Sequence, residues 1–469
     1  MKKFPKKYIA LQAISMSLTI IFFLALYAFT NFLPDEEGEV LVTLTMPIIY
    51  ILIGVVVAII LFSVIYSVFY HKTHGYEITE DEIILKQGVI FKKKTILSFS
   101  KINNIKTKRN ILHWIFGLEV LKLDSGSTST GVIPEIRLVD TPENIKELEK
   151  MVKQKVGIQV EEEKQTEYRF TFKNMLGYSY GRYLYLVTLG MVLVGALTLL
   201  FGQVEERMFG IIVLVLGVLG LPLFCALICF IMFYKFSITR KSNSIDLSYG
   251  LFEKKKNTIY LDKVRAIRIN QSLMQRILKT ATLVVEVIGF GSVNEKESTD
   301  VVIPYFKTSE LNGYMQLFFK EWDIDLKVEY TAPKRSFKFF VGMPMFLVNV
   351  YFASLVYLSF VIAKLYLIAL TSFLLTNLII LLLCYLKKKN LKFGYNDRFL
   401  TITKGYFGKH ILIINKKDIV FINKQTTPLR QKSGLASFTM VFFNTMGENA
   451  ETINLMEESC FDELINLTK

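Results

Sequence analysis

Six uncharged, mostly apolar stretches alternate with long segments in which apolar and polar residues are mixed. The stretches are Tyr8–Pro34, Val40–Tyr70, Tyr183–Val204, Met208–Tyr234, Phe339–Ala363 and Leu365–Leu386. A helix needs about 20 consecutive apolar residues to cross the hydrocarbon core of a bilayer, and each stretch is long enough. The pattern therefore predicts six transmembrane helices. They fall into three hairpins, because only short connectors separate the two members of each pair.

Lysine and arginine residues gather outside the predicted pairs. These residues include Lys2, Lys3, Lys6 and Lys7 before the first pair, then Lys72, Lys235 and Lys387–Lys389 at the starts of the long polar segments. Because basic residues favour the cytoplasmic side, both termini and all long polar segments are expected to be cytoplasmic. The first apolar run is too long for a signal peptide, and no small-x-small cleavage site follows it, so we expect an uncleaved anchor.

The long polar segments repeat one another. The stretch GVIFKKKTIL begins at Gly88, and GLFEKKKNTI begins 162 positions later at Gly250. The same offset relates Leu112 to Met274 without a gap. A fainter third copy follows after a further 155 positions, beginning at Gly405. The period is that of a whole domain plus its helix pair, which is too long for a solenoid repeat.

Within each copy, the alternation of apolar and polar residues predicts short strands, which glycine turns separate. An amphipathic helix is expected at the end of each copy. Its apolar stripes are Ile145, Leu148 and Val152, then Leu311, Tyr314, Met315 and Phe318, then Phe461, Leu464 and Ile465. Short strands followed by one such helix predict a small barrel or a bent sandwich that the helix closes. The helix pairs are then expected at residues 1–71, 166–235 and 331–389, and the domains at residues 72–165, 236–330 and 390–469.

One order of glycine, basic and aliphatic positions runs through the copies. It comprises Gly88, Lys92, Ile102, Ile105, Leu112, Gly117 and Leu118; then Gly250, Lys254, Val264, Ile267 and Met274; then Gly405, Lys409, Ile419, Ile422, Leu429, Gly434 and Leu435. This order resembles the bacterial pleckstrin-homology (PH) membrane proteins over essentially the whole chain. The resemblance implies three cytoplasmic PH-like β-barrel domains and no enzymatic activity. Two positions depart from the pattern: Lys279 replaces a glycine, and Gly408 interrupts the third basic cluster.

The composition agrees with a membrane protein. Of 469 residues, 52% are hydrophobic, the mean hydropathy is +0.39 and the net charge is +15. Beside six membrane spans, this charge favours the anionic inner leaflet over nucleic acid as a partner. Nucleic-acid binding would need aromatic residues clustered with the basic ones, whereas most aromatics here lie in the spans. Four scattered cysteines form no disulfide framework, which suits the reducing cytoplasm.

No catalytic motif is recognisable, so we expect neither an enzyme nor a cofactor. The sequence has no P-loop, zinc-protease motif or nucleophile elbow. His71 and His74 lack the further ligands of a zinc shell and are interpreted as polar caps of a membrane helix. Cys225 and Cys229 share one helix face, where packing is the favoured interpretation. Proton-coupled transporters and channels usually need ionisable residues within their membrane helices. No uncharged run here contains an internal acidic residue, arginine or histidine.

The candidate lipid-binding residues are Lys92, Lys93, Lys94, Lys254, Lys255, Lys256 and Arg276. Each lysine triplet lies just after a turn glycine, where it would contact anionic headgroups at about 1 kcal/mol per lysine. The alternative is a solvated hairpin whose lysines protect a strand edge from aggregation. Arg276 falls in a loop-like segment. For Trp114 and Phe116, a plug inside the barrel is favoured over insertion at the membrane interface.

These features favour a non-enzymatic membrane scaffold whose domains bind anionic lipid headgroups of the inner leaflet, partner proteins, or both. Envelope maintenance or tolerance of membrane-active antimicrobials is a plausible setting that no residue demonstrates. The alternative is a component or regulator of a transporter or flippase-like complex, with the six helices as the pathway. A membrane protein partner or a homo-oligomer is expected. The third copy keeps only Lys409, so its face is expected to meet a partner protein instead of the leaflet.

Overall fold

The structure is a computed structural model that describes residues 1–32, 46–89, 91–125, 135–155, 167–179, 185–287, 300–322, 328–361, 366–444, 447–460 and 465. The chain forms two compact units. The first contains Met1–Ser127, Ile133–Glu162 and Phe252–Thr258, and the second contains Thr128–Val132, Glu163–Leu251 and Ile259–Lys469. Most of the first sequence copy thus lies in one unit, and the third copy and most of the second lie in the other.

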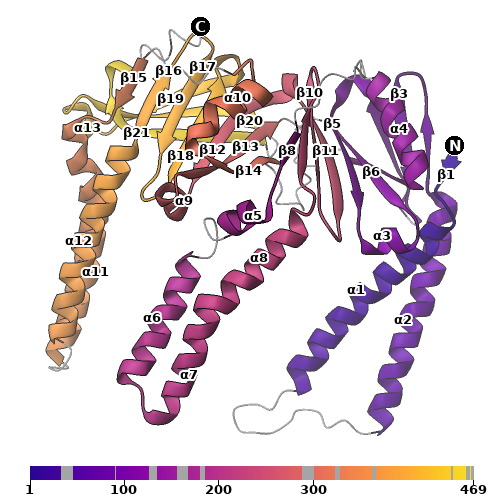
Figure 1. The fold of residues 1–469 in the computed structure, drawn as a ribbon, viewed down its shortest axis with the longest axis horizontal. Coiled ribbons are helices and arrows are strands. Elements are labelled where there is room, and N and C mark those ends of the chain that lie inside the picture. The colour runs from indigo at the N-terminus through magenta and orange to yellow at the C-terminus, as the bar shows by residue number, and fades with distance from the viewer. Residues whose placement is uncertain are drawn as a thin grey trace. The chain divides into compact units, whose positions relative to one another are not determined.

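Three hairpins of apolar helices are present (Figure 1). They comprise α1 (Lys7–Phe32) with α2 (Met46–Thr73), α6 (Tyr185–Phe201) with α7 (Val204–Val215), and α11 (Phe337–Val361) with α12 (Tyr366–Asn390). A π-helical segment, η3 (Leu216–Gly220), joins α7 to α8 (Leu221–Met232) without a break. Large apolar side chains such as Phe22, Leu61 and Leu223 are exposed on these helices, as on surfaces that face lipid.

Five of the six predicted spans are long and apolar enough within the described residues. They are Lys7–Leu26, Tyr50–Thr73, Glu206–Met232, Lys334–Ala353 and Leu370–Asn390. The remaining stretch, predicted as Tyr183–Val204, contains α6, which has 17 residues. The acidic connector of the first pair and Lys364 between the last two helices lie outside the described residues.

In the first unit, two small antiparallel sheets carry the first copy. One has the order β1 (Lys2–Lys3), β2 (Gly75–Ile78), β3 (Glu82–Gln87), β4 (Lys93–Ser98). The other has the order β7 (Glu135–Asp140), β6 (Glu119–Ser125), β5 (Ile102–Arg109). Next to β5 lies β11 (Lys254–Tyr260), of which residues 254–258 belong to this unit. The helix α4 (Pro142–Lys155) follows β7 and buries Ile145, Leu148 and Val152, the predicted stripe.

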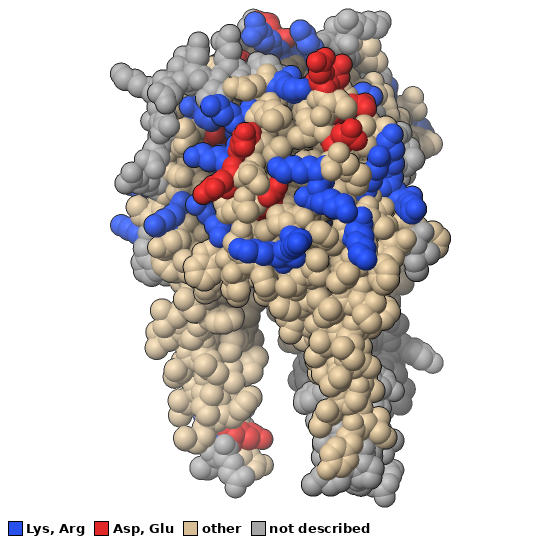
Figure 2. Space-filling model, turned by 90° about the vertical axis from the view of Figure 1, so that its right-hand side faces the viewer, with Lys and Arg blue, Asp and Glu red and all other residues tan. Residues whose placement is uncertain are grey.

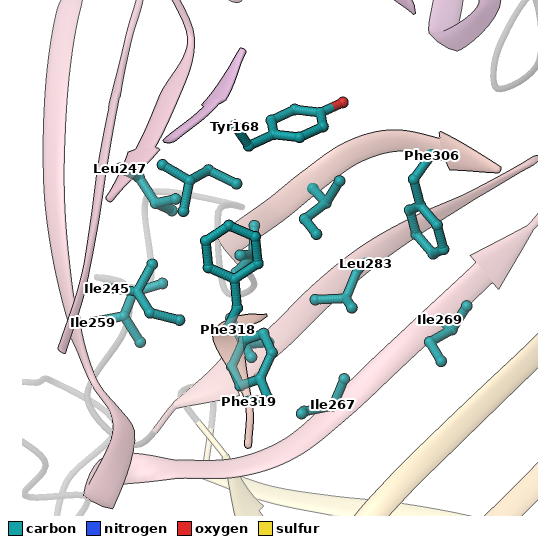
Figure 3. Close-up of a cluster of buried hydrophobic side chains, with 14 of the residues drawn as sticks. Tyr168, Ile245, Leu247, Ile259, Ile267, Ile269, Leu283, Phe306, Phe318 and Phe319 are labelled. Atoms are coloured by element: carbon teal, nitrogen blue, oxygen red, sulfur yellow. The ribbon is translucent and has the colours of Figure 1, made fainter. Parts of the chain in front are cut away.

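In the second unit, the second copy contributes three groups of elements. They are β8 (Glu167–Arg169), α5 (Phe172–Ser179), β9 (Ser237–Arg240) and β10 (Ser244–Tyr249); β12 (Val264–Gln271), β13 (Thr280–Val287) and β14 (Asp300–Lys307); and α10 (Leu311–Phe318). Figure 3 shows Phe318 and Phe319 between Ile245 and Ile259 on one side and Leu283 on the other. The predicted amphipathic stripe of this copy therefore lies in or against the domain core.

The third copy adds two sets of strands to the second unit. They are β15 (Val328–Thr331), β16 (Lys392–Tyr395), β17 (Phe399–Lys404) and β18 (Lys409–Asn415), then β19 (Ile419–Gln425), β20 (Leu435–Asn444) and β21 (Gly447–Glu457). The first set joins the second copy in one sheet of order β14-β13-β12-β18-β17-β16-β15, and the second set forms a sheet of order β19-β20-β21. Phe461 and Leu464 of the predicted terminal helix lie outside the described residues.

The predicted barrels are wrong, because the sheets are open. The strand that would close a barrel on its own copy instead pairs with a strand of the neighbouring copy. In the second unit β12 and β18 run antiparallel, with Ile267 opposite Ile413 and Ala266 opposite Ile414. All four side chains are buried. The apolar alternation is therefore satisfied by a sheet that two copies share.

Candidate membrane-contacting surface

A tight turn follows the second long strand of each copy, and it begins at a glycine. Gly88, Gly250 and Gly405 have φ angles of 109°, 109° and 145°, a backbone conformation that favours glycine. A Cβ atom at Gly88 would lie 1.9 Å from the carbonyl oxygen of Phe91. A positive φ angle at the corresponding glycine of all three copies confirms the internal repeat.

These turns expose aromatic side chains next to a lysine. Phe91, Phe252 and Phe407 are 89%, 52% and 41% exposed, and each lies within two residues of Lys92, Lys254 or Lys409. Rings and basic groups side by side are typical of the membrane–water interface, where an amphipathic surface is stable.

In the second and third copies, the turn is bonded to the end of a membrane helix. The backbone N–H of Gly250 donates to the carbonyl oxygen of Tyr234, and that of Leu251 donates to Ile231, at 2.9 and 3.0 Å. The side-chain amide of Asn390, the last residue of α12, donates to the carbonyl oxygens of Gly405 and Tyr406. These bonds hold both turns where the apolar helix ends.

The first lysine triplet is open to solvent. Lys92 precedes β4, and Lys93 and Lys94 begin it. All three side chains are exposed, and none of them makes an ion pair within the part of the chain that the structure describes. In the first unit, Lys and Arg side chains gather on the domain surface above the apolar helices, which are almost free of charge (Figure 2).

The second lysine triplet faces carboxylates. Lys256 Nζ lies 2.8 Å from Oε1 of Glu149 on α4, and Lys255 Nζ lies 3.5 Å from Oε1 of Glu253. Glu253 also pairs with Lys108 at 2.6 Å. Burial raises the pKa of Glu253, but the hydrogen bond and charge of Lys108, with Lys255, hold that pKa below its ordinary value. The two triplets, alike in sequence, thus differ in how far their charge is neutralised.

Arg276 lies at a contact between the second and third copies. Its guanidinium donates to the carbonyl oxygen of Phe407 and to Oδ1 of Asn390, both at 3.3 Å. Burial lowers the pKa of Lys409 in the same turn, and the charges of Lys392 and Arg276 lower it further. The structure therefore places Arg276 beside the third turn, where it braces the end of α12.

A second set of exposed apolar residues lies on a short helix in each copy. The three helices are α3 (Ile111–Ile115), α9 (Leu273–Ile277) and α13 (Pro428–Gln431). The side chains of Trp114, Ile115, Ile277 and Leu429 are 69%, 61%, 65% and 71% exposed. The expectation that Trp114 plugs a barrel is therefore wrong. Figure 1 shows α3 at the end of its domain from which α1 and α2 extend.

The helices are short and exposed because their ends are fixed locally. Asn110 accepts a hydrogen bond from the backbone N–H of His113 and caps α3. Ser272 and Gln275 form a reciprocal capping box on α9. Gly117 then ends the α3 segment with a φ of 63°. A helix of five residues between a cap and a left-handed turn leaves apolar side chains on the outside.

A cleft of about 650 Å³ between the second and third copies is a weaker candidate. Its charged residues are Asp262, Arg265, Glu321, Asp397, Arg398, Lys416, Lys417 and Asp418, four basic and four acidic. Arg265 is bound to Asp418. Because the cleft carries no excess of positive charge, it offers an anionic headgroup no net attraction.

The histidines near the first helix pair take part in packing. His71 Nε2 lies 2.8 Å from the carbonyl oxygen of Phe4, and the His74 ring packs between Phe4 and Tyr70, with 4.5 Å between ring centroids on both sides. No group of three metal-ligating side chains occurs in the described residues.

Comparisons with known proteins agree with this architecture. The sequence pattern of the bacterial PH domain matches residues 19–155, 185–312 and 346–468. The chain is also 22% identical over 387 residues to the UPF0699 transmembrane protein YdbT of Bacillus subtilis (strain 168), which covers 73% of this chain and 74% of the relative. No solved structure matches the chain. Each of the three matches includes residues of one helix pair and of the domain that follows it.

Proposed function

Because the chain belongs to the bacterial PH domain family, we propose that this transmembrane protein is a non-enzymatic scaffold of the cell membrane. In this proposal its termini and PH-like domains are cytoplasmic, and the domains bind anionic lipid headgroups. The observation that carries it is the exposed triplet Lys92–Lys94 beside Phe91. The corresponding turns of the other two copies are hydrogen-bonded to the end of a membrane helix.

The magnitude of the lysine attraction supports a role in orientation. The helix pairs already hold each domain beside the bilayer, so charge is not needed for recruitment. Three lysines at about 1 kcal/mol each would favour one facing of the first domain by about 100-fold where salt does not screen them. In the second copy, Lys255 and Lys256 meet acidic residues, so we assign that triplet mainly to the contact with α4 and β5, with lipid as a lesser partner.

The alternative is a component or regulator of a transporter or flippase-like complex. A pathway through the helices would need polar or ionisable groups at membrane depth. Within the described residues of the membrane helices α1, α2, α6, α7, α8, α11 and α12, charged residues occur only in the first or last turns, as at Lys7, Lys338 and Lys387. This distribution favours anchoring over transport.

The test uses the full chain, reconstituted in vesicles with and without phosphatidylglycerol. The four native cysteines are replaced, and a fluorophore is attached at Phe91→Cys. We expect stronger quenching by spin-labelled lipid in the anionic vesicles, and less of it at high salt.

The change Lys92–Lys94→Glu should abolish the difference between the two kinds of vesicle. The matched control carries glutamate at Lys101, Lys146 and Lys150, which are also exposed lysines of the first domain. It has the same net charge and should keep the difference. Equal quenching in both vesicles for the unchanged triplet would contradict headgroup binding.

A further inference from the structure

The second and third copies are joined by the pairing of one edge strand from each copy. The last strand of the first sheet in the third copy, β18, pairs with the first strand of the second sheet in the preceding copy, β12. In the first unit, β11 of the second copy lies next to β5 of the first in the same way. Each copy thus presents one edge to the copy before it and another to the copy after it.

Two such edges are left without a strand among the described residues. The strand β4 corresponds to β11 and β18, and it ends the order β1-β2-β3-β4. The strand β19 corresponds to β5 and β12, and it ends the order β19-β20-β21. An open edge offers unpaired N–H and C=O groups to another strand. The two open edges are of the complementary kinds that pair elsewhere in this chain.

Side chains on these edges are exposed where their counterparts are buried. Ile96 on β4 is 48% exposed, whereas Ile413, at the same position of β18, is 0% exposed. On the other edge, Phe421 is 49% exposed, and its counterpart on β12, Ala266, is 0% exposed. Val420 beside Phe421 is 52% exposed. On β12 and β18 these positions are covered by the strand of the neighbouring copy. On β4 and β19 no strand among the described residues covers them.

We propose that β4 of one chain pairs antiparallel with β19 of a second copy of this chain, so that the protein assembles head to tail. Transferring the β12–β18 register to these strands places Ile96 opposite Ile422, and Thr95 opposite Asn423. Leu97 then lies opposite Phe421. The contact continues the same sheet arrangement from one molecule into the next.

The charges permit this register. Lys94 would lie opposite Lys424, but Lys424 is already bound to Glu458. Within the chain, Lys256 occupies the position of Lys94 and finds its carboxylate on the terminal helix of the preceding copy. In the third copy, Glu457 ends β21, and Glu458, which binds Lys424, follows it.

The membrane also permits it. The β12–β18 contact joins two copies that are each anchored by their own helices, α8 and α12, in the second unit. Another contact of the same geometry would therefore leave the helices of the two joined copies in one bilayer. Because the two edges differ, the interface is heterologous and gives a ring if it closes and an open row if it does not.

Disulfide trapping in membranes tests the pairing. One chain carries Ile96→Cys and one tag, and the other carries Ile422→Cys and a second tag. All native cysteines are changed to alanine in both, at Cys225, Cys229, Cys384 and Cys460. A second pair is Thr95→Cys with Asn423→Cys. Opposite residues of an antiparallel ladder alternate between hydrogen-bonded and non-hydrogen-bonded pairs, which differ in Cα–Cα distance, so the two cysteine pairs sample both kinds. We expect oxidation to give dimers that contain both tags for at least one pair.

The matched control replaces Ile422→Cys by Gln425→Cys. This position is displaced by three residues, about 10 Å along the strand. Since a disulfide spans about 7 Å at most between Cα atoms, the control should give at least tenfold less mixed dimer. Dimers of Ile96→Cys with itself would show a two-fold interface and overturn the proposal. Absence of any dimer would overturn it as well. Lys92–Lys94 would then serve to keep the open edge of β4 from pairing with other strands.

A measurement of mass gives an independent answer. The unchanged protein in mild detergent should have the mass of an oligomer by light scattering. The change Phe421→Lys should reduce it to a single chain, whereas Leu429→Lys, at a more exposed apolar residue on α13, outside β19, should not. A single-chain mass for the unchanged protein, in membrane nanodiscs as well as in detergent, would contradict head-to-tail assembly.

Discussion

Lys256 binds Glu149 at 2.8 Å, and the two residues belong to successive copies of the repeat. The same carboxylate accepts a hydrogen bond from Lys153 at 2.7 Å, one helical turn away on α4. The counterpart of Lys256 in the first copy, Lys94, is exposed and has no such partner in the described residues. One sequence position therefore serves a contact between copies in one case and faces solvent in the other.

We expect Glu149→Gln to destabilise the first unit by about 2–3 kcal/mol, because it leaves Lys153 and Lys256 without their carboxylate and Lys153 is almost fully buried. Glu147→Gln, an exposed change on the same helix, should stay within about 0.5 kcal/mol. Thermal unfolding of the full chain in detergent measures both. Equal unfolding temperatures for the two variants would show that the pair contributes nothing.

The pH dependence of this pair has a defined sign. Burial raises the pKa of Glu149, but the charges of Lys153 and Lys256 outweigh it, and the pKa lies below its ordinary value. A lowered carboxyl pKa gives stability that is present above the pKa of the unfolded chain and is lost as the pH falls through the folded value. The destabilisation caused by Glu149→Gln should accordingly shrink below about pH 4.

A substitution at Lys279 should stabilise the protein. Lys279 has a φ of 53°, close to the 63° of Gly117 and the 62° of Gly434 at the same position of the other copies. The left-handed conformation costs a residue other than glycine about 1 kcal/mol. We therefore expect Lys279→Gly to raise the free energy of unfolding by up to about 1 kcal/mol, less the entropy that glycine adds to the unfolded chain.

The reciprocal change provides the control. Gly117 has no atom within 4 Å of a Cβ placed on it, so Gly117→Ala tests the backbone conformation without a clash. It should lower the free energy of unfolding by about 1 kcal/mol. If both substitutions destabilise the protein, the Lys279 side chain makes a contact that matters more than its backbone.

How far the sequence determined the fold can be judged from Ile413. Its place in an alternating apolar strand was predictable, because period-two burial is a local pattern. Its partner was not, since the same alternation suits a barrel closed within one copy and a sheet shared with Ile267 of the preceding copy. The repeat and the apolar helices were predictable for the same reason: both depend on local composition. Strand partners depend on distant residues.

The candidate site shows the same limit. The two lysine triplets could be found from their spacing, but only the structure shows that Lys256 meets a glutamate 107 residues earlier in the chain. Trp114 was misplaced because the five residues of α3 are too few to reveal a periodicity. The exposure of Ile96 could not be predicted either, because it depends on which strand covers β4.

His74 makes the first unit sensitive to mild acid. Burial, and then the charge of His71, lower the pKa of His74 to about 4. An unfolded histidine titrates near pH 6.5. Between pH 6.5 and pH 4, His74 is therefore protonated in the unfolded chain but neutral in the folded one. Stability is therefore complete above about pH 6.5 and falls as the pH drops towards 4, by at most about 3 kcal/mol in all.

His74→Phe removes this titration and keeps a ring between Phe4 and Tyr70. The unfolding temperature of the unchanged protein should fall between pH 7 and pH 5, and that of the variant should fall less. A parallel decrease in both proteins would assign the acid sensitivity to other groups.

The final prediction concerns Trp114, which we expect to rest in the membrane interface. The sequence has two tryptophans, and their environments differ. Trp114 is 69% exposed on α3, whereas Trp322 is 8% exposed and stacks on Phe399 with 4.7 Å between ring centroids. Each can be observed alone, in Trp322→Phe or in Trp114→Phe. Indole rings are enriched at the level of the headgroups because one end is apolar and the other can donate a hydrogen bond.

In vesicles that contain lipids brominated near the headgroup, the fluorescence of Trp114 should be quenched strongly and that of Trp322 hardly at all. Ile115→Ser on the same helix should weaken the quenching of Trp114, because it removes apolar area that would enter the interface. Ile277→Ser on α9 should leave the quenching unchanged. If the fluorescence of Trp114 stays typical of an indole in water and is not quenched, α3 does not contact the membrane. Its exposed apolar side chains would then be a binding surface for a protein.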